Sequence, residues 1–403
     1  MAVGTAAARA TVEKVDALRA QLPAVQTTGY FNAGSNGPIP TVAYEAADAA
    51  TRRELDQGRI IPGAYDGNRE RNRRVAALAA EIFGADADEI ALTHSACEGL
   101  NTALMGLRWE PGDEIVSTSE EHPGLLNPLG LLAHRHGVIT RFADIGDGGI
   151  HARVIEALAG AITSRTRLIA LSHVLWSTGA VLPLRDISAL AREHELLVVV
   201  DAAQSAGQTP VDLHGMGIDA YAMAGQKWLC GPEATGLLYV RKDRFADIAP
   251  TYVRYGQFEP SGYFIPAEGA KRFEIGEFYS PAIAAQEAAL RWLRDDVGFD
   301  WAHDRIAALG TDFRCRLTTI DGVSVVTPSK PMAGLVNFNV AGLRPQEVAA
   351  QLYERGYTIR YVDTAACSIS ARASVGWWNT EDEVAGLAHA VADLAAVARG
   401  GGG

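Results

Sequence analysis

The sequence has few cysteines, no long apolar run and no excess of positive charge. Its four cysteines, at positions 97, 230, 315 and 367, include no C-x-x-C pair, so neither a disulfide framework nor a metal site is expected. The formal net charge of −12 disfavours nucleic acid and anionic membranes as partners. Because no apolar run reaches the ~18 residues of a membrane helix and no signal peptide opens the chain, we expect a cytoplasmic protein.

The sequence also lacks a G-x-G-x-x-G motif, which leaves a Rossmann dinucleotide site with little support. It does contain apolar stretches that alternate with helical ones up to about residue 281. This alternation predicts a mostly parallel sheet covered by helices. Beyond that point, short strands and helices predict a small α+β domain. We expect an N-terminal segment (1–35) that packs with the small domain, a large domain (36–281) and a small C-terminal domain (282–403).

Two charged residues follow predicted strands in the middle of the chain. The apolar run Leu196–Val200 stops at Asp201, and the strand Asp219–Ala224 is followed within three residues by Lys227. Ligands bind at this edge of open α/β sheets. A lysine amine and a carboxylate placed together there suit pyridoxal phosphate (PLP), which needs a Schiff-base lysine and a partner for its pyridine nitrogen. The alternative is a capping aspartate and a surface lysine.

The text around this pair resembles the class V aminotransferases, a PLP family that includes cysteine desulfurases, cystine C–S lyases and isopenicillin N epimerase-like enzymes. The matching stretches are VVVDAAQSAG (198–207), DAYAMAGQKWLCGPEATGLLYV (219–240), GYFNAGSNGPIPTVAYEA (29–46), EEHPG (120–124), LSHVLWSTGAVLPL (171–184) and GAKRFEIG (269–276). In sequence, these stretches most resemble the cystine C–S lyase branch. The resemblance implies an α/β fold of the PLP-dependent transferase type, with a mostly parallel sheet in the large domain. It also implies a homodimer, in which segment 250–281 crosses the subunit interface.

The resemblance assigns cofactor roles to particular residues. Lys227 would bind the cofactor and remove the α-proton, Asp201 would hold the pyridinium, and Gln204 would bond the ring hydroxyl. His122 would stack on the ring and act with Lys227 at the catalytic centre. The remaining candidates line the phosphate turn or stand beside the lysine: Ala96, Cys97, Ala224 and Gln226.

Substrate roles follow in the same way. Arg372, in the run Ala371–Ser374, would grip the substrate α-carboxylate with its planar fork, and Arg360 is the second candidate. For any single arginine, the alternative is a surface ion pair. The loop residues Asn32 and Gly34 and the wall residue Trp176 complete the expected substrate contacts.

Some positions depart from the family pattern. The family usually has Ser or Thr three residues before the lysine and His one before it, where this chain has Ala224 and Gln226. Glu277 stands where the neighbouring subunit's phosphate-binding Thr is expected, and Trp176-Ser177 replaces an expected Asn. These changes alter the phosphate cup and the substrate wall. They favour a bulkier cysteine S-conjugate from specialised metabolism over simple cysteine or cystine.

We therefore predict a PLP-dependent C–S lyase that releases a thiol or persulfide, pyruvate and ammonia by β-elimination. An aminotransferase, an epimerase, an oxidative deaminase–decarboxylase and a non-catalytic regulator remain open. A desulfurase needs a mobile cysteine thiolate that takes up sulfur. Near the arginine motif the chain offers only Cys367, five residues before Arg372. The sequence therefore favours direct elimination.

Overall fold

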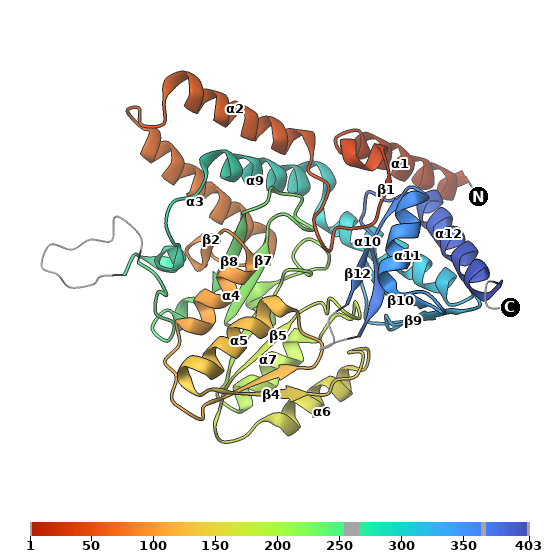
Figure 1. The fold of residues 1–403 in the computed structure, drawn as a ribbon. Helices are drawn as coiled ribbons and strands as arrows, with labels where there is room; N and C mark the ends of the chain where they lie inside the picture. Colours follow the sequence, from red (N-terminus) through yellow and green to blue (C-terminus); the bar gives the residue numbers. More distant parts are fainter. Residues whose placement is uncertain (1, 254–265, 364–367, 401–403) are drawn as a thin grey trace, which may run out of the picture.

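A computed structural model describes residues 2–253, 266–363 and 368–400, which form three sheets and their covering helices (Figure 1). The α-helices are α1 (Ala2–Arg19), α2 (Thr41–Gln57), α3 (Ala64–Phe83), α4 (Ala96–Met105), α5 (Pro123–His136), α6 (His151–Ala161), α7 (Leu184–Glu193), α8 (Leu213–Met216), α9 (Ser280–Trp292), α10 (Phe299–Leu317), α11 (Pro345–Glu354) and α12 (Glu381–Gly400). The strands are β1 (Gly29–Tyr30), β2 (Ile90–Thr93), β3 (Glu114–Thr118), β4 (Ile139–Ala143), β5 (Thr166–Ser172), β6 (Leu197–Asp201), β7 (Ala220–Ala224), β8 (Gly236–Val240), β9 (Val323–Val325), β10 (Leu335–Val340), β11 (Tyr357–Thr358), β12 (Arg360–Val362) and β13 (Ser370–Ser374).

The largest sheet has seven strands in the order β2-β8-β7-β6-β5-β3-β4. All neighbouring pairs are parallel except those made by β8, which runs antiparallel to β2 and β7. The predicted mostly parallel α/β sheet is therefore confirmed. The strand order places the ends of β6 and β7 side by side, because these two strands are direct neighbours.

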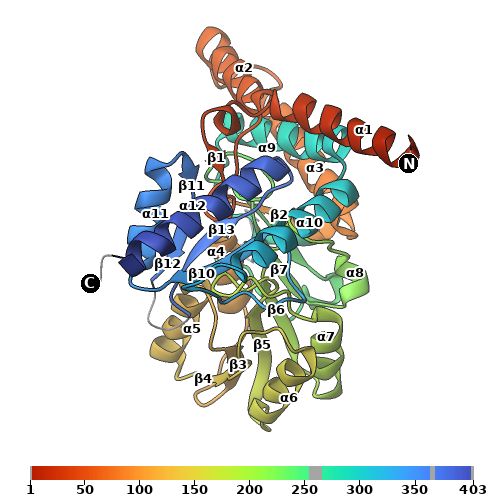
Figure 2. The same cartoon turned by 90° about the vertical axis from the view of Figure 1, so that its right-hand side faces the viewer.

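Helices cover both faces of this sheet. Figure 2 shows α5 on one side of the strands and α7 and α8 on the other. Strand β6 is apolar on both faces, which explains its unbroken valine run. Val198 and Val200 pack in the core that contains α6 and α7, whereas Val199 packs in the core that contains α4 and α5.

The second sheet is antiparallel, in the order β12-β13-β10-β9. Alternation along β13 divides its residues between two faces. Ala371 and Ala373 pack in the core under α10, α11 and α12. Ser370, Arg372 and Ser374 lie on the opposite face. The core-facing alanines thus turn the arginine away from the helices.

Three predicted elements differ from the structure. The sequence pattern predicts one short strand over Thr358–Arg360, whereas the structure has two strands, because Ile359 packs in the core and the chain passes there from one sheet to the other. Strand β11 pairs with β1, and β12 pairs with β13. The pattern also predicts a helix over Ala282–Asp295, whereas α9 ends at Trp292 and continues as a π-helix, Leu293–Val297. An amphipathic helix is expected over residues 1–22, before Pro23, whereas α1 ends at Arg19.

The N-terminal segment contacts the C-terminal part of the chain. Gly29 and Tyr30 pair with β11, and the Arg19 guanidinium lies 2.7 Å from the Glu383 carboxylate. The division into a segment 1–35 that packs with the small domain, a large domain and a small domain stays a prediction. Within the described ranges, no helix is both long and apolar enough to cross a membrane.

Candidate active site

Asp201 is the last residue of β6 and lies opposite Ala222 of β7. Its side chain is buried, and Oδ1 accepts a hydrogen bond from the backbone N–H of Ala203 at 2.9 Å. Across residues 2–253, 266–363 and 368–400, no hydrogen bond to its second oxygen is found. Burial raises the pKa of the Asp201 carboxyl, an effect that the Ala203 N–H and the Lys227 ammonium oppose. One oxygen is thus anchored, and the other is available to a ligand.

Lys227 follows β7 by three residues and reaches the same edge of the sheet. Its half-buried side chain makes no hydrogen bond within the described part of the chain. Burial lowers the pKa of the Lys227 amine, and Arg372 adds to this effect, while Asp201 and Cys97 oppose it. A lowered pKa increases the fraction of neutral amine, the form that attacks an aldehyde. The predicted meeting of the acid and the lysine is therefore found in the fold.

His122 caps the N-terminus of α5 at this edge. Its Nδ1 accepts a hydrogen bond from the Gly124 N–H at 2.9 Å, which leaves any ring proton on Nε2. Its ring meets Trp176 edge to face, with centroids 4.7 Å apart. Burial lowers the pKa of His122 to about 4, assisted by Lys227 and Arg372. The imidazole is therefore neutral at pH 7, and its stacking on a cofactor ring stays a prediction.

The predicted phosphate turn is the start of α4. Ser95 is the N-cap, and its Oγ accepts a hydrogen bond from the Glu98 N–H at 3.1 Å. Ala96 and Cys97 occupy the first two helical positions, where backbone N–H groups have no partner within the helix. Such N–H groups and the helix dipole suit an anion. The interaction between Cys97 and both Asp201 and Lys227 places this turn beside the acid and the lysine.

Arg372 approaches from the small antiparallel sheet. It is 3% exposed, and no carboxylate of the described residues pairs with it. Burial lowers its pKa to about 10, with a smaller contribution from Arg360, which lies opposite it across β12 and β13. Arg360 is exposed, and its guanidinium lies 5.0 Å from the centre of the Tyr361 ring. The buried guanidinium therefore has no charge partner among the described residues, and its grip on a substrate carboxylate stays a prediction.

The loop containing Asn32 and Gly34 lies directly against Arg372. A Cβ atom on Gly34 would come within 3.0 Å of Arg372 Nη2 and 2.7 Å of Ser374 Oγ. Gln204 holds this loop, because its Nε2 donates to the Gly34 carbonyl at 2.9 Å and its Oε1 accepts from the Trp228 indole at 3.0 Å. One N–H of the Gln204 side chain remains without a partner. The hydrogen bond of Gln204 to the hydroxyl of the cofactor ring stays a prediction.

The two residues that depart from the family pattern next to the lysine are placed differently. Ala224 is buried at the end of β7, whereas Gln226 is half-buried. The backbone carbonyl of Gln226 accepts a hydrogen bond from the Gly37 N–H at 2.8 Å. This bond joins the predicted substrate loop to the lysine segment.

Of the fourteen buried side-chain polar atoms that have no hydrogen-bond partner within the described residues, six belong to these residues or to neighbours of Arg372. The atoms are Asn32 Oδ1, Trp176 Nε1, Gln226 Oε1, Asn337 Oδ1, Arg372 Nε and Ser374 Oγ. Unpaired buried polar groups are costly, and they fit a site that a polar ligand completes. Three of these groups are complementary to PLP: the free oxygen of Asp201 to the pyridine nitrogen, the Lys227 amine to the aldehyde, and the N-terminus of α4 to the phosphate. The Arg372 guanidinium is complementary to the carboxylate of an amino acid.

Two of these atoms belong to residues that the sequence did not single out. Asn337 lies opposite Arg372 in the register of β10 and β13, and Ser374 lies two residues beyond Arg372 on the same face. The alternation S-A-R-A-S is the signal that points to Ser374. Asn337 carries no local signal, because only the pairing of β10 with β13 brings it to the site.

Some expected contributors lie elsewhere or outside the described residues. Glu277 lines a cavity of about 150 Å³ together with Arg69 and Arg71. The adjacent Phe278 stacks on His94, with ring centroids 4.9 Å apart. Cys367 and the stretch 254–265 are outside the described residues. The predicted interface role of segment 250–281 therefore stays a prediction.

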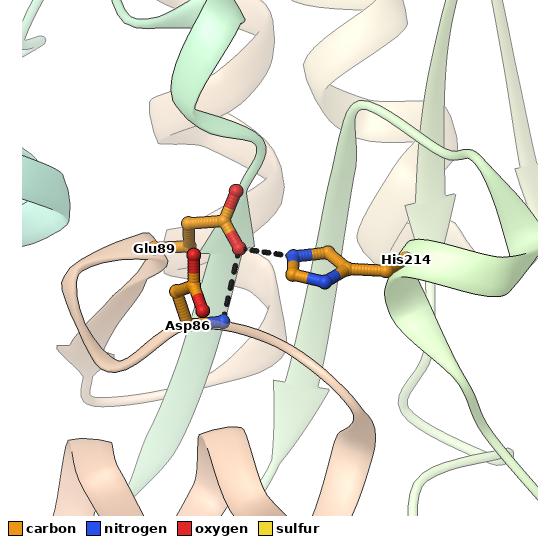
Figure 3. A group of neighbouring side chains, drawn as sticks. All are labelled: Asp86, Glu89 and His214. Atoms are coloured by element: carbon orange, nitrogen blue, oxygen red, sulfur yellow. Dashed lines mark hydrogen bonds and ion pairs between the residues drawn. The ribbon is translucent and has the colours of Figure 1, made fainter.

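A second cluster of titratable groups lies away from this edge (Figure 3). Glu89 Oε2 accepts from the Asp86 N–H at 3.0 Å and lies 2.6 Å from His214 Nε2. The Lys242 ammonium lies 2.9 Å from the Asp86 carboxylate, so a side-chain cation already pairs with one of the carboxylates of this cluster. The cluster joins the turn before β2 to α8 and to the end of β8.

Comparison with known proteins places this geometry in a family. A model of the family "Aminotransferase class-V" matches residues 69–387. The chain is 31% identical to a probable cysteine desulfurase 2 of Mycobacterium leprae, over 88% of this chain and 84% of that protein.

Solved structures agree with this assignment. The cystine C–S lyase C-DES in complex with its product cysteine persulfide has a TM-score of 0.87 and 32% identity, over 93% of this chain and 99% of that one. An apo cysteine desulfurase of Thermococcus onnurineus has a TM-score of 0.85 and 25% identity, over 95% and 98% of the two chains. The family expected from the sequence is confirmed: the chain belongs to the class V aminotransferases.

Proposed function

We propose that the protein is a PLP-dependent C–S lyase that eliminates a thiol or persulfide from a cysteine S-conjugate. The observation that carries the proposal is the convergence of Asp201, Lys227 and Arg372 on one site. The guanidinium and Asp201 both influence the pKa of the Lys227 amine, although the three residues come from different strands of two sheets. An α-amino acid needs this combination: a carboxylate grip, an amine to hold the cofactor and an acid for its ring.

Bound PLP would supply an electron sink for the substrate's α-carbon. The chain's own groups have separate tasks. The free oxygen of Asp201 would hold the pyridine N–H, and the N-terminus of α4 would hold the phosphate. Arg372 would orient the substrate by its carboxylate, so that the Lys227 amine could take the α-proton. A sulfur substituent on Cβ would then leave as a thiolate with the C–S bonding pair, and water would convert the remaining enamine to pyruvate and ammonia.

The proposed substrate class rests on the wall beside His122. Trp176 meets the His122 ring edge to face and is 9% exposed, so an aromatic side chain forms the wall on this side of the site. Such a wall favours an apolar substituent on the substrate sulfur. The names of the relatives support C–S bond chemistry, since C-DES is called a cystine C–S lyase and the Mycobacterium leprae relative a probable cysteine desulfurase. A PLP cofactor is likewise named in a C-DES structure.

We also propose a homodimer, as the sequence predicted. Several large apolar side chains are exposed along α2, the α2–α3 connection, α3 and the start of α9: Tyr44, Leu55, Ile60, Tyr65 and Tyr279. Exposed apolar groups of this size are typical of subunit contacts. Light scattering tests this proposal, and a monomer at micromolar concentration would contradict it. The cytoplasmic location stays a prediction.

The experiment that tests the proposed function is reduction with borohydride after reconstitution with PLP. Tryptic mass spectrometry should find the reduced cofactor on the peptide that contains Lys227. The Lys227→Ala variant should carry no fixed cofactor and should release no pyruvate from S-benzylcysteine. A Lys242→Ala variant is the matched control, because that lysine pairs with Asp86 in the second cluster, away from the candidate site. An active Lys227→Ala variant would contradict the assignment.

A further inference from the structure

Glu121 is a buried carboxylate for which the proposed chemistry has no use. It is fully buried, and both of its oxygens accept hydrogen bonds. Thr118 Oγ1 donates at 2.8 Å, Ser172 Oγ at 2.5 Å, and the Ser172 backbone N–H at 2.9 Å to the nearer oxygen. Within the part of the chain that the structure describes, no arginine or lysine pairs with it. A buried acid without a cation is costly to keep and needs an explanation.

The position of Glu121 connects it to two residues of the site. It directly precedes His122, the N-cap of α5. Its partner Ser172 is the last residue of β5 and lies opposite Asp201 in the register of β5 and β6. The carboxylate therefore fastens the turn after β3 to the strand beside Asp201. A shift of this carboxylate would move His122 relative to Asp201.

We propose that Glu121 is a positioning residue that fixes His122 at the cofactor ring and supplies negative charge behind Asp201. This inference rests on the proposed PLP site. The charge acts on the ring nitrogen through Asp201, and the hydrogen bonds act on the orientation of His122.

The surroundings of Glu121 set the pH range in which it is charged. Burial raises the pKa of Glu121 to about 7, the bonds from Ser172 and Thr118 oppose the rise, and Asp201 adds to it, so the carboxylate supplies its negative charge mainly above pH 7. Of the groups nearby, burial keeps His122 and His173 neutral at pH 7. Glu120 turns the other way, toward Ser177 and Ser368. Asp201 is thus the charged group that faces Glu121 from a neighbouring strand.

Glu121→Gln tests the inference, because glutamine keeps the shape and can hydrogen-bond to both hydroxyls but carries no charge. The measurement is the visible absorption of the PLP-reconstituted protein between pH 5.5 and 9.5. Negative charge nearby favours the protonated, cationic form of the bound cofactor. Loss of the Glu121 charge should therefore lower the midpoint pH of the spectral titration by about 0.5–1. Weaker PLP binding, measured by fluorescence titration, should accompany the shift.

Two further variants keep the test decisive. Ser172→Ala removes the 2.5 Å bond while retaining the backbone donor. Because that bond opposes the rise in the pKa of Glu121, its loss should leave less negative charge on the carboxyl group and move the midpoint in the same direction as Glu121→Gln, but by less. Glu89→Gln changes another buried, hydrogen-bonded carboxylate far from the site and should leave the midpoint unchanged. A purely structural role would lower the melting temperature of Glu121→Gln without moving the midpoint.

The outcomes separate this inference from the proposed function. If the wild-type protein carries PLP on Lys227 while Glu121→Gln and Ser172→Ala both titrate like wild type, the positioning role is wrong. If the wild-type protein fixes no PLP on Lys227, the proposed function itself fails. If Glu121→Gln does not fold, an unshifted midpoint in Ser172→Ala overturns the inference.

Discussion

Replacing Arg372 by lysine changes the substrate grip while keeping a positive charge. The guanidinium is buried, and no described carboxylate pairs with it, so its N–H groups are available to a substrate. Arginine can bind a carboxylate through two parallel hydrogen bonds, whereas a lysine ammonium cannot reproduce the planar fork. The substitution should therefore remove one charge-assisted hydrogen bond and disturb the other.

The size of the effect follows from the free energy of such a bond. A hydrogen bond to a charged group contributes about 1.5–3 kcal/mol net, so the variant should lose about 2–3 kcal/mol of transition-state binding. Since about 1.4 kcal/mol corresponds to a factor of ten, kcat/KM should fall roughly 30- to 150-fold. Arg360→Lys is the control. Arg360 is exposed and stacked on Tyr361, so its replacement should cost less than about fivefold.

The free energy of unfolding also reports on the burial of Arg372. Arg372→Met replaces a buried guanidinium that lacks a described partner with an apolar side chain of comparable length. Relief of that burial should raise the free energy of unfolding by about 1 kcal/mol in the cofactor-free protein, while turnover is lost. Urea denaturation of both proteins measures the difference. The proposed role of Arg372 would be wrong if kcat/KM of Arg372→Lys stayed within threefold of the wild-type value and Arg372→Met were less stable than wild type.

Two further predictions follow from single positions. Gly34→Ala places a Cβ 3.0 Å from Arg372 Nη2, so steady-state kinetics should show KM for an amino-acid substrate raised at least tenfold, and a wild-type KM would contradict the contact. Burial lowers the pKa of His303 to about 4, whereas an unfolded histidine titrates near 6.5. The unfolded state therefore binds the extra proton between those pH values, and stability falls as the pH drops through this window. Urea titrations measure how much free energy of unfolding is lost between pH 6.5 and pH 4.5. In His303→Met this loss should be smaller by about 2 kcal/mol than in wild type, and equal losses would contradict the assignment of the pH effect to His303.

Local patterns predicted much of this fold. The valine run before Asp201 required burial on both faces, and burial on both faces is typical of a parallel strand in the middle of a sheet. The short strand that precedes Lys227 followed from its run of apolar residues. Because neighbouring parallel strands end at one edge, the meeting of Asp201 and Lys227 could be expected from sequence order alone.

Features set by long-range pairing could not be predicted in this way. The insertion of β8 between β2 and β7 depends on pairing across more than a hundred residues. Ser172 is 51 residues from Glu121, so the partner of this carboxylate is invisible to local reasoning. The break at Ile359 reflects a choice between two sheets. These features depend on contacts between residues far apart in the sequence, which neither periodicity nor local propensity predicts.

The central claim is that carbon–sulfur cleavage is direct, with no enzyme cysteine taking up the sulfur. The decisive measurement is the stoichiometry of pyruvate, released sulfur and enzyme-bound sulfane sulfur in one turnover of S-benzylcysteine and of cysteine, for wild type and Cys367→Ser. We expect equal amounts of pyruvate and of released thiol or sulfide. We also expect no sulfane sulfur on alkylated enzyme and most activity retained in Cys367→Ser. Alanine in place of pyruvate, substrate sulfur on Cys367, or loss of turnover in a PLP-loaded Cys367→Ser variant would contradict the lyase assignment.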